Sequence, residues 1–141
     1  SEFHRKKIGF VFQKFNLLPM LNVRENIVLP LTLGGETVDD EYIDELIQFL
    51  GLRQREKHLP GELSGGQQQR VSIGRALATK AEVLLADEPT GNLDQNTSYE
   101  IMEYFRNLNK KYGKTIIMIT HDMNLAQNAD EIIQIVDGRI I

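Results

Sequence analysis

One stretch, residues 63–88, constrains the fold of this 141-residue chain more than any other. Its first half is a glycine turn that enters a helical pattern over 67–77. Its second half contains an aliphatic run, 83–86, which ends in the adjacent carboxylates Asp87 and Glu88. A continuous aliphatic strand is typical of a parallel sheet with both faces covered. The stretch therefore predicts an α/β domain with a mainly parallel sheet.

The glycine turn consists of Ser64, Gly65 and Gly66, and it precedes a helix that we expect over 67–77. Two glycines let the backbone approach a ligand closely. The unpaired amides and the positive dipole end of a helix can hold a phosphate. The same three residues also fit a plain serine cap after a turn. The glutamine-rich run that begins at Gln67 favours phosphate binding.

Asp87 and Glu88 stand at the carboxyl end of the predicted strand, where ligands bind in open α/β sheets. An aspartate at this position can hold Mg²⁺, usually through water. The adjacent glutamate can take a proton from an attacking water. The pair also fits two exposed acids behind a core strand. The turn over 89–94 favours the catalytic interpretation because it carries a further carboxylate, Asp94.

Two more polar residues follow predicted strands. His121 comes after a strand over 115–120, and Gln13 comes after a strand over 8–12. In a parallel sheet both would lie at the same edge as Asp87. An imidazole there can contact a phosphate and orient a water. The side-chain amide of Gln13 can ligate Mg²⁺ or bind the attacking water. A structural role is the alternative for His121, because a lone histidine is more often structural.

The rest of the chain alternates predicted helices and strands. The apolar periodicity and the glycine stops Gly51 and Gly113 predict helices that end there. Capping boxes are expected at Thr37 with Asp40 and at Thr97 with Glu100. The further expected elements are helices over 39–50, 96–112 and 123–128, a third core strand over 131–136, and a hairpin turn at 137–138.

Composition narrows the classes of partner. The formal net charge is −4, so we expect no nucleic-acid partner. The chain has no cysteine, which excludes disulfides and thiolate chemistry. No apolar run approaches the ~20 residues that span a bilayer. A role at a membrane would therefore come through a partner subunit. The apolar loop after Gln13 is either packed into the core or a contact surface for such a partner.

Taken together, these residues resemble the nucleotide-binding subunit of ATP-binding-cassette (ABC) transporters over essentially the whole chain. A finer pattern over 9–13 and 15–19 looks like the branch that handles macrolide export, lipoprotein release and antimicrobial-peptide efflux. The matching motifs are Leu63–Gln67 (signature), Val83–Asp87 (Walker B), Glu88 (catalytic glutamate), Gln13 (Q-loop), Asn92–Asp94 (D-loop) and His121 (switch histidine).

The resemblance implies a head-to-tail dimer with each ATP between two domains. Ser64, Gly65, Gly66 and Gln67 would serve the partner's ATP. The domain's own Mg²⁺-ATP would be served by Asp87, Glu88, Gln13 and His121. Asp94 of the D-loop would be a further catalytic residue. An integral membrane permease subunit would dock at the loop over 17–19, which places the protein in the cytoplasm on the inner face of the cell membrane. Residues 22–80 would form a helical signature subdomain, and 1–21 with 81–141 would form parts of a RecA-like core.

One departure from the family pattern is large. A phosphate loop of the form G-x-x-x-x-G-K-S/T, expected before Gln13, does not occur in the 141 residues. We therefore expect a partial, N-terminally truncated nucleotide-binding domain without the phosphate-loop strand, which alone does not hydrolyse ATP. The resemblance places that strand between the His121 strand and the strand at Glu131. Its absence predicts either association through the free sheet edge or a rearranged segment after Asp122.

Two other functions remain open on the sequence. The first is a soluble ABC-type ATPase of the DNA-repair or chromosome-organising kind. Such proteins carry a long coiled coil between the Q-loop and the signature, whereas about fifty residues without sustained heptads separate Gln13 from Leu63. The second is a non-catalytic module that completes another protein's ATP site. The presence of Asp87, Glu88 and His121 disfavours it.

Overall fold

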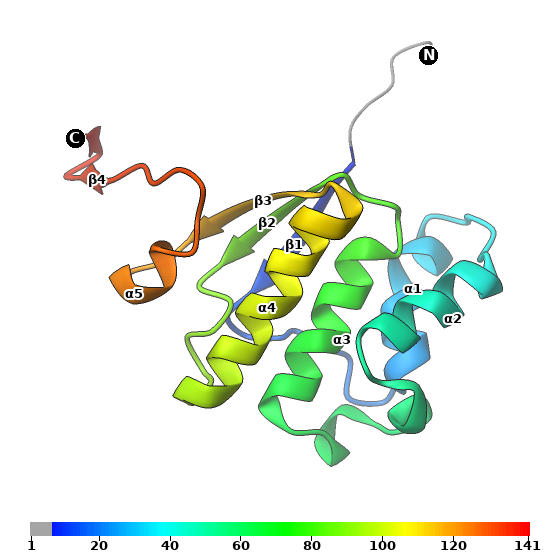
Figure 1. Cartoon of the computed structure of the whole chain (residues 1–141). Helices are drawn as coiled ribbons and strands as arrows, with labels where there is room; N and C mark the ends of the chain where they lie inside the picture. Colours follow the sequence, from blue (N-terminus) through cyan, green and yellow to red (C-terminus); the bar gives the residue numbers. More distant parts are fainter. Residues whose placement is uncertain (1–6) are drawn as a thin grey trace, which may run out of the picture.

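A three-stranded parallel sheet organises the chain in the computed structural model, which describes residues 7–141 (Figure 1). The strands are β1 (Ile8–Phe12), β2 (Val83–Asp87) and β3 (Thr115–Ile119), with β2 in the centre. Phe12 pairs with Asp87, and Asp87 pairs with Ile119. The three strands therefore end level with one another. All three match the predicted strands closely. Residues 1–6, which were expected to belong to the RecA-like core, lie outside the described part.

Helices cover one face of this sheet. The helix α3 (Gly65–Leu77) packs directly on β1, and α4 (Gln95–Tyr112) lies beside it (Figure 1). The helices α1 (Val23–Leu33) and α2 (Asp40–Phe49) pack on the outer side of α3. The core lies between these layers, and its largest fully buried side chains are Ile27, Ile43, Ile47, Leu50, Leu52, Ile73, Leu77, Leu84 and Ile101.

Residues 22–80 contain no strand; besides α1, α2 and α3 they form two short 3₁₀ helices, η1 (Arg53–Arg55) and η2 (Pro60–Glu62). This agrees with the predicted helical region. Arg24 connects its parts through ion pairs with Asp40, Asp44 and Glu56. These carboxylates raise the pKa of the Arg24 guanidinium above its usual value. The region is held together by charge contacts at its surface as well as by its apolar core.

The other face of the sheet is not covered by the described residues. Along β1 the burial alternates, with Gly9 and Val11 buried and Phe10 49% exposed. On β3, Ile117 is 50% exposed. The expectation that both faces of the sheet are covered was therefore wrong for the described part of the chain. An aliphatic strand shows that its side chains suit an apolar environment, but it does not supply the layer that covers them.

The helix ends agree with the glycine signals but not with the predicted capping boxes. Gly113 directly follows α4 with a φ of 66°, and Gly51 follows Leu50, the C-cap of α2, with a φ of 68°. Glycine adopts this left-handed conformation without a Cβ clash. At its start, however, α2 is capped by Asp39, whose carboxylate accepts from the Tyr42 amide, rather than by Thr37. The helix α4 begins after Asp94, so the capping box predicted at Thr97 is also wrong.

The predicted third core strand over 131–136 is wrong in extent and in partner. Only β4 (Ile135–Val136) is a strand, and it pairs antiparallel with β5 (Arg139–Ile140) in a separate hairpin. The turn at Asp137 and Gly138 has positive φ at both residues, as predicted. In Figure 1 the chain leaves β3 through the short helix α5 (Met123–Ala126) and this hairpin stands apart from the main sheet. A rearranged segment after Asp122 is one of the two outcomes expected above.

No helix within residues 7–141 combines the length and the apolar character that a bilayer-crossing helix requires.

Candidate functional site

The site lies at the edge of the sheet where all three strands end. The register of the strands sets Gln13, Glu88 and Thr120 directly after three adjacent strands. The structure therefore brings together the polar residues that the sequence placed after separate strands. In α/β proteins this edge is the usual ligand-binding position.

Glu88 is held by the chain that follows β3. Its Oε1 accepts a hydrogen bond from the His121 backbone amide at 2.8 Å and lies 3.6 Å from His121 Nε2. Its Oε2 lies 3.4 Å from the Thr120 hydroxyl. The His121 side chain is 98% exposed, whereas that of Glu88 is 22% exposed. The carboxylate is thus fixed, and the imidazole beside it is open to a ligand.

The backbone of Glu88 is also unusual. Its φ is 46°, in the left-handed region that residues with a Cβ rarely adopt. The Glu88 amide donates to the Ile119 carbonyl at 2.8 Å, which continues the pairing of β2 with β3 and holds this conformation. Strained backbone of this kind persists where the surrounding contacts fix it, and it is concentrated at functional sites.

Gln13 contacts the turn between β2 and α4. Gln13 Nε2 donates to Asn92 Oδ1 at 3.2 Å, and Asn92 Nδ2 donates to the Gln13 carbonyl at 3.1 Å. Asp94 stands at the N-cap of α4, but its side chain caps nothing there. The carboxylate of Asp94 is exposed, which leaves it accessible to a second molecule.

Asp87 and Gln13 fit a magnesium ion only in part. Both present hard oxygen atoms on exposed side chains at neighbouring strand ends, the ligand type that Mg²⁺ prefers. Within residues 7–141 no group of three or more histidine, cysteine or acidic residues is placed to hold a metal. Mg²⁺ would therefore take its remaining ligands from water and phosphate, as it usually does.

The glycine turn forms the N-terminus of α3. Ser64 Oγ accepts from the Gln67 amide at 3.2 Å, and Gln67 Oε1 accepts from the Ser64 amide at 2.9 Å. This is a capping box, so Ser64 caps α3, and the assignment of the turn to a phosphate stays a proposal. Gly66 has a packing role that the sequence did not reveal. A Cβ on Gly66 would come within 2.5 Å of the Thr97 side chain on α4.

The apolar loop after Gln13 is partly packed and partly exposed. Arg75 on α3 donates to the Asn16 and Phe15 carbonyls at 2.8 and 2.9 Å and anchors the loop. Burial removes water from this guanidinium and lowers its pKa. Met20 remains 68% exposed and Leu18 39% exposed. One part of the loop is therefore packed against α3, and another part is exposed and available to a partner.

Sequence reasoning missed Gln69, which is fully buried on α3. Its Nε2 donates to the Phe12 carbonyl at 3.1 Å and to the Pro89 carbonyl. Its Oε1 has no partner among the described residues. A glutamine on the apolar side of a helix could have signalled a buried polar contact, although not its partners.

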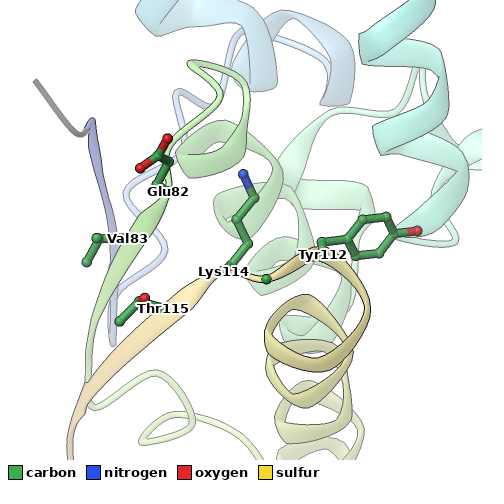
Figure 2. A pocket seen from close by; sticks show the side chains of 6 residues that line it. Glu82, Val83, Tyr112, Lys114 and Thr115 are labelled. Carbon is green, nitrogen blue, oxygen red and sulfur yellow. The ribbon is translucent and has the colours of Figure 1, made fainter. Parts of the chain in front are cut away.

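A shallow pocket of about 310 Å³ lies at the opposite end of the sheet (Figure 2). Its lining comes from the starts of β2 and β3 and the end of α4, including Glu82, Lys114 and Thr115. None of the predicted site residues lines it. The ligand site indicated by the sequence therefore lies at the other sheet edge.

The parallel sheet, its helical layer and the polar groups at the strand ends define an α/β domain of the nucleotide-hydrolase class. The family model described as "ABC transporter" matches residues 1–91. The chain belongs to the ABC transporter family.

Similar proteins include both fused and separate ATP-binding components. A protein of Mannheimia succiniciproducens named macrolide export ATP-binding/permease protein MacB is 48% identical, over 100% of this chain and 22% of its own length. The Escherichia coli K12 protein named uncharacterized ABC transporter ATP-binding protein YbbA is 44% identical, over 99% of this chain and 62% of its own length. The chain thus spans less than two thirds of each of these relatives.

Solved structures of ABC cassettes share the fold. The dimeric cassette MJ0796, described as a post-hydrolysis state bound to ADP and Pi, superposes with a TM-score of 0.79 and 43% identity. That match covers 96% of this chain and 61% of the other. The protein cbiO1 of Clostridium perfringens gives a TM-score of 0.87 at 30% identity, over 97% of this chain and 56% of the other. The ABC cassette fold predicted from the sequence is confirmed.

Proposed function

We propose that the chain is part of the ATP-binding and hydrolysing subunit of a transporter that exports or extracts a substrate across or from a membrane. One observation carries this proposal: Gln13, Glu88 and His121 meet at one sheet edge, with the Glu88 carboxylate held 3.6 Å from the imidazole. Glu88 would accept the proton of the attacking water, and His121 would contact the transferred phosphate. Mg²⁺ bound with Asp87 and Gln13 would neutralise charge on the phosphates.

The proposal includes a second nucleotide-binding domain. The glycine turn forms the N-terminus of α3, an element separate from the strands that precede Gln13 and Glu88, and Asp94 is exposed at the N-cap of α4. We assign Ser64, Gly65, Gly66 and Gln67 to the ATP of the partner domain. The free amides of a helix N-terminus suit a phosphate. Support for a pair of domains comes from the MJ0796 cassette, whose structure is described as dimeric.

The membrane part of the proposal rests on the relatives and on the loop after Gln13. The MacB relatives are named as ATP-binding and permease proteins in one. We propose an integral membrane permease as partner of this chain, with Leu18 and Met20 at the contact, because both are apolar and exposed. The chain would then lie at the cytoplasmic face of the membrane. The relatives' names favour an exported substrate of the macrolide kind.

Partner-dependent ATP binding tests the assignment of the glycine turn. The chain is mixed with intact E. coli YbbA, and their association is measured by sedimentation with ATP and with ADP. We expect a complex with ATP that is lost in Gly65→Asp, since a carboxylate there repels the phosphate. The matched control is Gly61→Asp, because a Cβ on Gly61 meets no atom within 4 Å. The proposal would be overturned if the two proteins associate to the same extent with ATP and with ADP, and if Gly65→Asp leaves this association unchanged.

A further inference from the structure

Asn92 and Gln13 form a reciprocal pair although they are 79 positions apart. The Gln13 amide nitrogen Nε2 donates to Asn92 Oδ1, and the Asn92 amide nitrogen Nδ2 donates to the Gln13 backbone carbonyl. Each bond is 3.1–3.2 Å long. The pair links the loop after β1 to the turn after β2.

This pattern fixes which way both side-chain amides face. Asn92 Nδ2 must point at the Gln13 carbonyl, because the opposite orientation would set two oxygens against each other. Asn92 Oδ1 therefore faces Gln13 Nε2, and it can only accept. The remaining polar atom of Gln13, Oε1, accepts no hydrogen bond from the described residues. It is left for a ligand, and it is the amide atom that binds a hard cation.

Gly91 makes room for the same arrangement. A Cβ at Gly91 would lie 2.6 Å from Gln13 Nε2 and 2.7 Å from Gln13 Cδ, closer than atoms in contact allow. The Gly91 amide donates to the Glu88 carbonyl at 3.0 Å. The turn that presents Asn92 is thereby attached to the residue that carries the carboxylate of the site.

We propose that Asn92 is a positioning residue that holds the Gln13 carboxamide with Oε1 facing the ligand side of the site. The role of Oε1 toward a cation or water rests on the proposed function. Asn92 stands two residues before Asp94, on the turn that joins β2 to α4. Because Asn92 makes both of these hydrogen bonds, a displacement of this turn would change the orientation of the Gln13 side chain.

Nuclear magnetic resonance of the ¹³C- and ¹⁵N-labelled chain tests the pair without requiring activity. The readouts are hydrogen exchange of the Gln13 side-chain amide and scalar coupling across the bond from Gln13 Nε2 to Asn92 Cγ. Asn92→Leu keeps the volume and removes both bonds. Asn92→Asp keeps the acceptor for Nε2 and removes the donor to the carbonyl. Asn96→Leu, on the exposed first turn of α4, is the matched control.

We expect the coupling in the unmodified chain and its loss in Asn92→Leu, with amide exchange of Gln13 faster by roughly 2- to 10-fold. Asn92→Asp retains slow exchange, and Asn96→Leu changes neither readout. Equal exchange in the unmodified chain and in Asn92→Leu would overturn the proposal. Failure of the ATP-dependent association described above would instead count against the proposed function, because the pair is measured without nucleotide.

Discussion

The side-chain amide of Gln69 lies 3.1 Å from the carbonyl oxygen of Phe12, 57 positions away in the sequence. The same nitrogen donates to the Pro89 carbonyl. Phe12 directly precedes Gln13, and Pro89 directly follows Glu88. One buried amide on α3 therefore fixes the two backbone segments from which the site residues project.

Gln69→Leu is expected to destabilise the fold by ~1–3 kcal/mol, because it removes the amide donor from one buried and one partly buried carbonyl. Gln69→Glu should cost more at neutral pH, since a buried carboxylate would face the same two oxygens. Urea denaturation measures both changes. Gln48→Leu, at an exposed position of α2, should leave the unfolding midpoint in place. A Gln69→Leu variant as stable as the unmodified chain would show that the amide contributes nothing.

The 141-residue polypeptide should not turn over ATP by itself. It contains no phosphate loop, so little in it neutralises the β- and γ-phosphates. A phosphate-release assay with Mg²⁺-ATP should give the same rate for the chain and for Glu88→Gln. Turnover of the purified chain that disappears in Glu88→Gln would contradict this prediction.

Tyr42 should make the stability pH-dependent in the alkaline range. Its hydroxyl donates to the Leu77 carbonyl at 2.8 Å. Burial, followed by the charge of Glu45, raises its pKa above 10.0 in the folded state. A raised folded-state pKa means that this stabilisation is complete below the unfolded value and is lost as pH rises through the folded value.

Tyr42→Phe should therefore cost ~1 kcal/mol at about pH 8. Its deficit relative to the unmodified chain should shrink at about pH 11. Denaturant titrations of both proteins at the two pH values give the comparison. The Lys80 ammonium lies 5.2 Å from the Tyr42 ring centre, so both titrations should be repeated with Lys80→Gln. A deficit that stays constant with pH would exclude a role for Tyr42 ionisation.

The uncovered sheet face should drive concentration-dependent association of the chain. Phe10 and Phe12 stack on it with ring centres 6.0 Å apart, and β3 presents a free edge among the described residues. Analytical ultracentrifugation should show a sedimentation coefficient that rises with concentration. Phe10→Ser should weaken this rise, whereas Leu33→Ser, at a 78% exposed site on α1, should not. A chain that stays monomeric at high concentration would disprove the expectation.

The elements of the fold and the position of the site could be predicted from local patterns. The strand over 83–86 and the glycine after residue 112 are signals that neighbouring residues set by themselves. The strand expected over 131–136 failed because its sequence specifies an apolar extended segment but not a partner edge. The prediction that the second face of the sheet is buried was wrong for the same reason. The contacts of Asn92 and Gln69 were not predicted because their hydrogen bonds span 79 and 57 residues.

The sequence by itself determined where the candidate residues stand: Glu88 and Gln13 directly after strands, His121 just behind a third strand, and the glycine turn at the start of a helix. Parallel pairing of three strands then decided that the first three of these meet at one edge. Only the tertiary structure decided how each is held, by the His121 amide for Glu88 and by Asn92 for Gln13. Hydrogen-bond partners brought close by folding have no signature in local sequence, because their separation along the chain is unrelated to their distance in space.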